Sequence, residues 1–458
     1  MSSPNVKAAV DEALARYESN NPKSRALYQD AVKHLPGGNT RSLLHTNPFP
    51  IMVKSGQGHM LIDEDGHKYH DFIGELAAGL FGHSNPLLIK ALTDAANTVG
   101  LSLGATHVQE ARYAQLLCER FNLERIRFCN SGTEANLHAL AAARKFTGRR
   151  KVVAFKGGYH GSVLAFGAGQ PPRKGETEPA FRLGPAENNV DLQDFIVLQY
   201  NDVAAVRQLL SSPQKSEIAA VLVEPMQGSG GAIPASEEFL YAIQEECAKA
   251  GIIFVLDEVM TSRTGPGGIK SLFPASRPLR PDITTLGKYL GGGMPIGAFG
   301  GSEAVMAVYD PRLAGAMFHS GTFQNNTLML HMGYAAMSQV YTPAKAIEHA
   351  GRGEALREKL RAVTRGSKVF VSGKGTLMFV HISRKWGSSD NGFTCKEDGG
   401  DEEWDLKSLF WMHMLEEGFW VQRRGSIALI LDTPQEVLDG FVAAVQRFIE
   451  RYAALVRL

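Results

Sequence analysis

The stretch Asp282-Ile-Thr-Thr-Leu-Gly-Lys288 is a short apolar run that ends at a lysine. Upstream of it, Gly251-Ile-Ile-Phe-Val-Leu-Asp257-Glu258 is a second apolar run, which ends at acids. Continuous apolar runs of this length, bounded by glycine, indicate strands that are buried on both faces, as in a parallel sheet. A single lysine or acid after a strand is most often a solvated loop residue. The meaning of this pair therefore depends on what the other strand ends contain.

Between about residue 105 and residue 330 the sequence alternates short apolar runs with helical patterns. Strands are expected at 126–129, 151–155, 218–223, 252–256 and 298–300, and helices at 134–146 and 237–250. Strands spaced by helices predict an α/β fold with a mostly parallel sheet that helices cover on both faces.

The flanking regions have a different pattern. We expect a polar helical stretch up to about residue 31, hairpin strands at 50–54 and 59–63, a helical region after 335, strands at 376–381 and 427–431, and a final amphipathic helix over 434–458. The C-terminal part is typical of a smaller α+β unit. Two polar segments, 170–189 and 385–405, are expected to be surface excursions.

Composition excludes several classes of function. The 458 residues have a net charge of +1, so no overall field attracts nucleic acid or an acidic membrane. No basic start followed by an apolar run marks a signal peptide, and no apolar stretch is long enough to span a bilayer. The four cysteines form no CxxC pair, so neither a disulfide framework nor a metal site is expected. We expect a cytoplasmic protein.

Other strand ends also contain chemically useful groups. Asn130-Ser-Gly-Thr-Glu-Ala-Asn136 opens a helix, where free N–H groups and the helix dipole favour an anion, although Ser131 or Thr133 is equally suited to be a simple helix cap. Gly157-Gly-Tyr-His-Gly161 offers a flat tyrosine ring, and simple packing is the alternative. His160 could support a neighbouring group of a site or hydrogen-bond to nearby backbone, and we favour the latter.

In a parallel sheet the carboxyl ends of the strands meet at one edge, where α/β proteins bind ligands. Glu224 and Asp257 each end an apolar strand, and Lys288 ends another. An amine that can form an imine and a carboxylate that keeps a pyridine nitrogen protonated are the two groups that pyridoxal phosphate (PLP) chemistry requires.

The chain resembles the class III group of fold-type-I PLP-dependent aminotransferases. The motifs with this resemblance follow the family's order over 125–325: Asn130–Asn136, Gly157–Gly161, Asp257–Met260, Thr285–Lys288 with Gly291–Gly297, and Ser320–Phe323. Within the group it is similar to glutamate-1-semialdehyde 2,1-aminomutases and, more closely, to bacterial aromatic β-amino acid (β-phenylalanine) aminotransferases. The resemblance implies a large domain with a mostly parallel seven-stranded sheet and a smaller α+β domain. We place an N-terminal segment at 1–75, the large PLP-binding domain at 76–335 and the small domain at 336–458.

The resemblance also implies a role for each matched residue. Lys288 would form the imine with PLP and then move the proton as a neutral amine, while Asp257 would pair with the pyridine nitrogen. The remaining cofactor contacts would come from Ser131, Gly132 and Thr133 at the phosphate, Tyr159 and Val259 on the two ring faces, Glu224 and Gln227 near the phenolic oxygen, and Thr322 of a neighbouring subunit. A site shared in this way implies a homodimer with two-fold symmetry.

Two arginines bear on the substrate. In the β-amino acid enzymes that the chain resembles, arginines matching Arg41 and Arg424 hold substrate carboxylates, as bidentate guanidinium groups can. Surface arginines are the alternative, and Arg423 beside Arg424 leaves the register open. The stretch Thr261-Ser-Arg263 departs from the Gly-Phe-Arg form of the aminomutases, which weakens that alternative.

The resemblance implies a ping-pong transaminase that moves an amino group from a β-amino acid or amine to a keto acid, 2-oxoglutarate or pyruvate. Three alternatives stay open: an intramolecular aminomutase, an amine (omega) transaminase with no carboxylate requirement, and a non-catalytic scaffold of the same fold.

Overall fold

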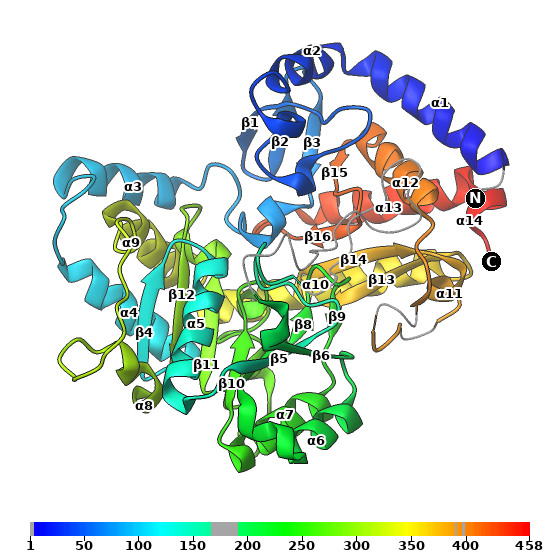
Figure 1. The fold of residues 1–458 in the computed structure, drawn as a ribbon. Coiled ribbons are helices and arrows are strands. Elements are labelled where there is room, and N and C mark those ends of the chain that lie inside the picture. The colour runs from blue at the N-terminus through cyan, green and yellow to red at the C-terminus, as the bar shows by residue number, and fades with distance from the viewer. Residues whose placement is uncertain (1–3, 166–190, 390–391, 396–398) are drawn as a thin grey trace.

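A seven-stranded sheet forms the centre of the molecule (Figure 1). The computed structural model describes residues 4–165, 191–389, 392–395 and 399–458. The strand order is β4-β12-β11-β10-β7-β5-β6, and β12 alone runs antiparallel to its two neighbours. The strands are β4 (Arg125–Cys129), β5 (Lys151–Phe155), β6 (Phe195–Leu198), β7 (Ile218–Val223), β10 (Ile253–Asp257), β11 (Ile283–Gly287) and β12 (Gly297–Gly301). The mostly parallel sheet is as predicted; β6 is a strand that the sequence analysis missed.

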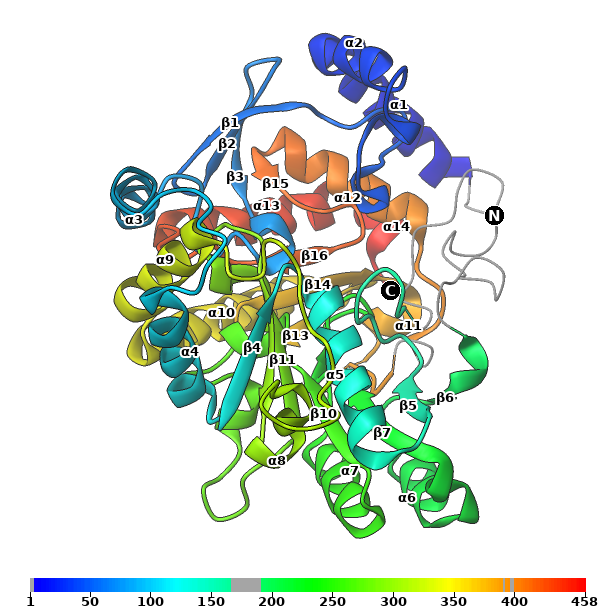
Figure 2. The ribbon, with the colours of Figure 1, turned by 60° about the vertical axis from the view of Figure 1, so that its left-hand side comes forward.

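Helices cover both faces of this sheet because its strands are apolar on both sides. In β7 the alternate residues Ala220 and Leu222 join the core under helix α5, whereas Val221 and Val223 join the core under α6 and α7. Figure 2 shows α5 lying along the sheet. The bounds are α5 (Gly132–Thr147), α6 (Val203–Ser211) and α7 (Glu237–Ala250). A strand buried on both faces has to be a continuous apolar run, which is the pattern observed.

The N-terminal segment and the C-terminal part of the chain share a second sheet, with the order β1-β2-β3-β15. The strand β15 comes from near the C-terminus and pairs in parallel with β3, and α1 packs on α12. Figure 1 shows this blue N-terminal layer beside the orange and red C-terminal elements. The strands are β1 (Val53–Gln57), β2 (Met60–Asp63), β3 (Lys68–Asp71) and β15 (Phe419–Trp420), and the helices are α1 (Pro4–Asn20), α2 (Pro22–Ala31) and α12 (Trp404–Glu416).

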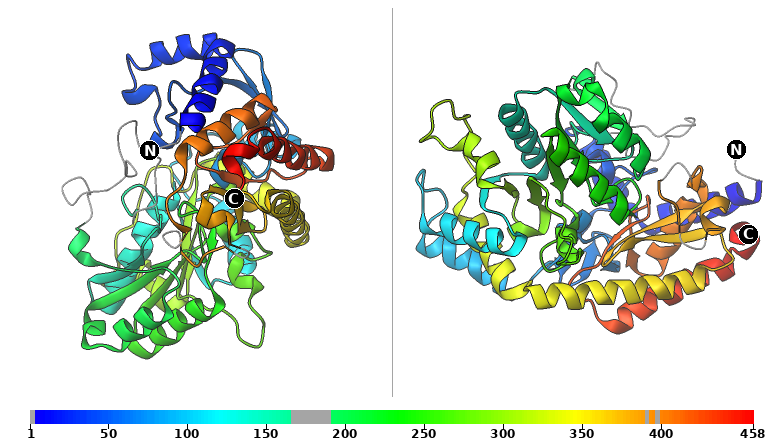
Figure 3. Two further views of the ribbon diagram at one scale, coloured as in Figure 1. Left: turned by 90° about the vertical axis from the view of Figure 1, so that its right-hand side faces the viewer. Right: turned by 90° about the horizontal axis from the view of Figure 1, so that it is seen from below.

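A three-stranded antiparallel sheet, β13-β14-β16, completes the C-terminal part. The long helix α10 packs on both β13 and α13, and it spans the molecule in the right-hand view of Figure 3, where it is yellow. The bounds are β13 (Val369–Lys374), β14 (Leu377–Ile382), β16 (Ser426–Ala428), α10 (Pro343–Thr364) and α13 (Gln435–Arg451). The division into three domains stays a prediction.

The remaining elements are short or peripheral. They are α3 (Pro86–Thr98), α4 (Val108–Phe121), α8 (Glu303–Met306), α9 (Thr327–Ala335), α11 (Arg384–Gly387), α14 (Ala453–Val456) and the two-stranded pair β8 (Met226–Gln227) and β9 (Ile233–Pro234). Within the described ranges, none of the helices combines the length and the apolar character needed to cross a bilayer.

The structure corrects two expectations. The first hairpin strand lies at Val53–Gln57, not at 50–54, so the turn is at Gly58 and His59. The described parts of 385–405 are only partly at the surface: Trp386 is fully buried with its ring centroid 3.8 Å from that of His381, and Oε1 of the buried Glu402 lies 2.7 Å from Nδ1 of His381. The polar composition of this segment predicted a surface location, but the acid Glu402 is buried and paired with His381. The segment 170–189 lies outside the described residues.

Candidate active site

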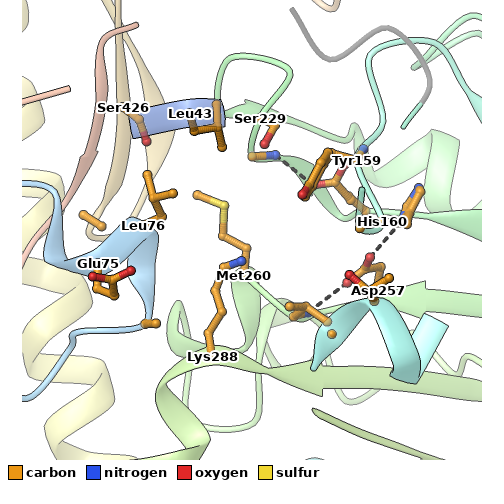
Figure 4. A pocket seen from close by; sticks show the side chains of 18 of the residues that line it. Leu43, Glu75, Leu76, Tyr159, His160, Ser229, Asp257, Met260, Lys288 and Ser426 are labelled. Carbon is orange, nitrogen blue, oxygen red and sulfur yellow. Dashed lines mark hydrogen bonds and ion pairs between the residues drawn. The ribbon is translucent and has the colours of Figure 1, made fainter. Parts of the chain in front are cut away.

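The carboxyl ends of the parallel strands surround a cavity of about 330 Å³. Lys288 follows β11, Asp257 ends β10 and Glu224 follows β7, and all three line this cavity. Figure 4 labels Lys288 and Asp257 there. The wall facing them comes from the N-terminal segment and from the C-terminal part of the chain, which contribute Arg41 and Arg424 among others. The structure thus brings together residues that the sequence separates by hundreds of positions.

Lys288 lies in the left-handed region of the backbone, with φ +57. A non-glycine residue in this region is uncommon and indicates that the surroundings fix the side-chain direction. Burial lowers the pKa of the Lys288 amine, while the nearby carboxylates of Asp257 and Glu224 oppose this shift. Desolvation is the larger effect, so the environment favours the neutral amine.

The carboxylate of Asp257 is buried and held by donors on both oxygens. Oδ2 accepts hydrogen bonds from Nδ2 of Asn136 at 2.8 Å and from Nδ1 of His160 at 2.7 Å, while Oδ1 accepts one from the Val259 backbone N–H at 2.9 Å. The ring of His160 contacts this acid, so the alternative that His160 supports a neighbouring group of the site holds for its Nδ1. Figure 4 draws the contact.

Asn136 and Thr285 are polar residues whose function the sequence analysis missed. Oγ1 of Thr285 donates to Oδ1 of Asn136 at 2.8 Å, which turns the Asn136 amide so that its Nδ2 donates to Asp257. Asn136 is four residues after Gly132, hence on the same face of α5, and this spacing was a usable signal. The outcome is a fully hydrogen-bonded acid inside the sheet edge.

The N-terminus of α5 opens toward the same cavity. Ser131 is the helix cap, since its Oγ accepts from Glu134 N at 3.2 Å, and Gly132 and Thr133 line the cavity. A Cβ at position 132 would lie 2.6 Å from Cγ1 of Val259, so only glycine allows this approach. The first N–H groups of a helix have no partner within it and attract anions.

Glu224 organises the opposite side of the cavity. Its Oε1 accepts from Tyr159 N and its Oε2 from Gly228 N, each at 2.9 Å. Burial raises the pKa of this carboxyl to about 7. Tyr159 lines the cavity, whereas Gln227 is buried outside its lining and donates from Nε2 to Lys156 O at 2.8 Å.

The structure separates the two adjacent arginines. Arg424 lines the cavity and is only 7% exposed; its Nη2 donates to Ser229 O at 2.9 Å, and its Nε is a buried atom for which the described chain offers no partner. Burial lowers the pKa of Arg424 to about 10. Arg423 instead points to Ser408, with Nε 2.9 Å from its Oγ. Of the two arginines, Arg424 is therefore the one that faces the cavity.

Arg41 also lines the cavity, but it is half exposed and paired with Glu75, an acid that the sequence analysis did not select. The predicted Val259 lines the cavity too, whereas the apolar lining residues Leu43, Leu76 and Phe379 were not predicted. Thr322 is exposed and outside the cavity of its own chain. No group of three or more potential metal ligands occurs in the part of the chain that the structure describes.

These groups fit PLP. The cavity offers an amine, an ionisable acid that two side chains and one N–H hold in place, and a helix N-terminus suited to a phosphate. The aldehyde, ring nitrogen and phosphate of the cofactor need these three partners.

Comparisons with known proteins decide the family. The family model for aminotransferase class III matches residues 44–432. The chain belongs to the class III aminotransferases. It is a transaminase, and PLP is its cofactor, as the sequence predicts.

The most informative relative of this class III aminotransferase is a β-phenylalanine transaminase of Variovorax paradoxus, 42% identical over 98% of each chain. The crystal structure of a β-phenylalanine aminotransferase from that organism has a TM-score of 0.90, at 41% identity over 99% of each chain. An uncharacterised aminotransferase of Schizosaccharomyces pombe is 45% identical over 99% of this chain and 98% of its own. A glutamate-1-semialdehyde 2,1-aminomutase of Chloroherpeton thalassium is 35% identical over 69% of this chain and 73% of its own.

Proposed function

We propose that this class III aminotransferase takes the amino group of a β-amino acid, or of a related amine, and passes it to a keto acid such as 2-oxoglutarate or pyruvate. The two substrates would bind in turn at one site, in a ping-pong sequence. The β-phenylalanine transaminase, 42% identical over nearly the whole chain, supports this donor class.

The buried guanidinium of Arg424 is the observation that supports this class of donor. Among the described residues this buried guanidinium has no carboxylate partner, and its Nε has no partner at all. Its desolvation cost is therefore large, and an anionic ligand in the cavity would offset it. A carboxylate can accept from two guanidinium N–H groups at once. We infer that Arg424 binds the carboxylate of the donor and so orients its amine toward Lys288.

The chain's own residues would divide the remaining work. PLP, when bound, supplies an aldehyde for the amine and a ring that accepts electron density from the substrate carbon. Asp257 would hold the proton at the ring nitrogen, because Asn136 and His160 keep its carboxylate oriented. Lys288 would hold the cofactor through Nζ and then, as a neutral amine, move a proton to and from the substrate carbon.

Other contacts position the cofactor. We assign the phosphate to Ser131, Gly132 and Thr133 at the start of α5, the ring faces to Tyr159 and Val259, and the phenolic oxygen to Glu224 with Gln227 behind it. Thr322 would reach the phosphate from a second copy of the chain, which makes the active form a homodimer.

A substrate panel tests the proposal. The purified holoenzyme is given β-amino acids, α-amino acids and arylalkyl amines, each with 2-oxoglutarate and with pyruvate, and formation of the new amino acid is measured. We expect turnover with β-amino acids only when a keto acid is present. Equal rates on amines without a carboxylate would favour an amine transaminase instead.

An aminomutase is the second candidate, since aminomutases are also among the relatives. Such an enzyme moves the amino group within one substrate. Turnover of glutamate-1-semialdehyde without any added keto acid would support it, and we expect none.

A further inference from the structure

Two arginines line the cavity, and they differ in how they are paired. Arg424 has a hydrogen bond to a backbone carbonyl and a buried Nε without a partner in the described chain. Arg41 instead forms an ion pair with Glu75, and both members of this pair line the same cavity. One carboxylate-binding group is therefore open, and the other already has an acid of its own chain.

Glu75 is part of a turn that is left-handed over four consecutive residues. The φ angles are +49 at Gly74, +49 at Glu75, +53 at Leu76 and +76 at Ala77. For non-glycine residues this conformation is strained, because the Cβ atom comes close to the backbone. Strain of this kind persists only where the surroundings impose it, and it concentrates at functional sites.

Buried polar groups impose this turn. Oδ1 of Asp71 accepts from Ile73 N at 2.7 Å and from Gly74 N at 3.0 Å, and Nη1 of the fully buried Arg263 donates to Ala77 O at 3.2 Å. At Gly74 a Cβ would lie 2.8 Å from Ala428 O. The turn is thus held at both ends.

The consequence is visible in Figure 4, where Glu75 and Leu76 lie side by side on the wall of the cavity, across from Tyr159 and Asp257. Leu76 adds apolar surface to this wall, while Glu75 adds the acid that Arg41 contacts. An extended backbone would send alternate side chains to opposite faces, so the left-handed turn is what allows neighbours to share one wall.

We propose that Glu75 is a specificity-determining residue. Its ion pair with Arg41 would leave Arg424 to bind one ligand carboxylate and would weaken the binding of a second. This inference rests on the proposed function of the site. A donor with one carboxylate and an apolar remainder leaves the Arg41–Glu75 pair intact. A ligand with two carboxylates has to compete with Glu75 for Arg41, which makes Glu75 the residue that sets the affinity for dicarboxylic acceptors.

Binding of unreactive acids to the PLP-loaded enzyme tests this directly. Glutarate has two carboxylates, and glutaramate, its half-amide, has the same size but only one; neither has an amino or keto group. Their dissociation constants are measured by calorimetry for the natural enzyme, Glu75→Gln, Arg41→Met and the double variant. Glutamine keeps the shape of the turn residue, and the cofactor's absorbance reports an intact site.

We expect Glu75→Gln to tighten glutarate binding about fivefold to tenfold, as suits one charge removed beside a half-exposed guanidinium, and to leave glutaramate nearly unchanged. In Arg41→Met and in the double variant, any preference for glutarate over glutaramate should disappear. An unchanged preference in Glu75→Gln would overturn the proposal, as would an equal gain in the double variant, because Glu75 would then act without Arg41. Since no turnover is measured, the result is independent of whether β-amino acids prove to be the donors.

Discussion

Nδ1 of His160 lies 2.7 Å from Oδ2 of Asp257, and both side chains are buried. The same oxygen also accepts from Asn136, so the acid at the end of β10 has two side-chain donors from two other elements of the fold. The Asp257 side chain is thereby fixed in the orientation that a charged partner in the cavity requires.

Replacing Asn136 by alanine tests this arrangement. Asp257 keeps His160 but loses one donor, and a hydrogen bond to a charged group contributes about 1.5–3 kcal/mol. We expect the rate of amino transfer from donor to cofactor to fall about tenfold to a hundredfold, measured by single-turnover absorbance.

Thr285→Val is the matched control. It removes only the bond that orients the Asn136 amide, so its effect should have the same direction and be smaller. A larger loss in Thr285→Val than in Asn136→Ala would contradict this order of contacts.

Arg424→Met should abolish recognition of the donor carboxylate. Loss of one partner of a buried charge pair costs about 2–5 kcal/mol, so kcat/KM for a β-amino acid should fall about thirtyfold or more. An arylalkyl amine has no carboxylate and should react at nearly the original rate. The ratio of the two kcat/KM values is the measurement.

Arg423→Met provides the control, because the neighbouring arginine points to Ser408 and away from the cavity. It should leave that ratio unchanged. Equal losses on both donors in Arg424→Met would show that the residue maintains the fold of the site and does not read the carboxylate.

Much of the large sheet could be predicted because its strands are continuous apolar runs. Helix α7 was predicted with its observed bounds, and β7 likewise. The strands β3, β6, β8, β9, β13 and β15 were missed. β15 has two residues, Phe419 and Trp420, and exists only because β3 lies beside it, which no local pattern reveals.

The candidate site divides in the same way. Motif residues such as Lys288 and Asp257 follow strands and could be selected from their spacing, whereas Glu75 could not. It faces the cavity because of a left-handed turn that distant residues impose, and Arg263, one of these, comes from another part of the chain. Contacts between segments that are far apart in the chain cannot be predicted from the local sequence pattern, so Glu75 could not be selected.

Thr322 provides a prediction about assembly. The residue is exposed and lies outside the cavity of its own chain, so any role at the phosphate requires a second copy. Thr322→Val should weaken PLP binding, measured by titration of the cofactor-free enzyme.

Mixing Thr322→Val with Lys288→Ala should restore activity at one of the two sites of a mixed dimer, because that site has Lys288 from one chain and Thr322 from the other. The exposed neighbour Ser320, changed to alanine, serves as control. Recovery that fails even though mixed dimers form would argue against a shared site.

Glu224 makes the stability of the cofactor-free protein depend on pH. Burial raises the pKa of this carboxyl from 4.5 to about 7, so between these values the folded state binds more protons than the unfolded state. Its contribution to the free energy of unfolding is therefore fully present below about pH 4.5 and is lost as the pH rises through about 7. This pKa shift corresponds to a loss of about 3 kcal/mol in the free energy of unfolding.

Glu224→Gln tests this, because its side chain cannot ionise. The free energy of unfolding, measured with urea at a series of pH values, should vary less with pH in this variant between about pH 4.5 and 7. The control Glu358→Gln changes an exposed residue and should follow the parent protein. A profile in Glu224→Gln that still falls by the same amount would assign the titration to another group.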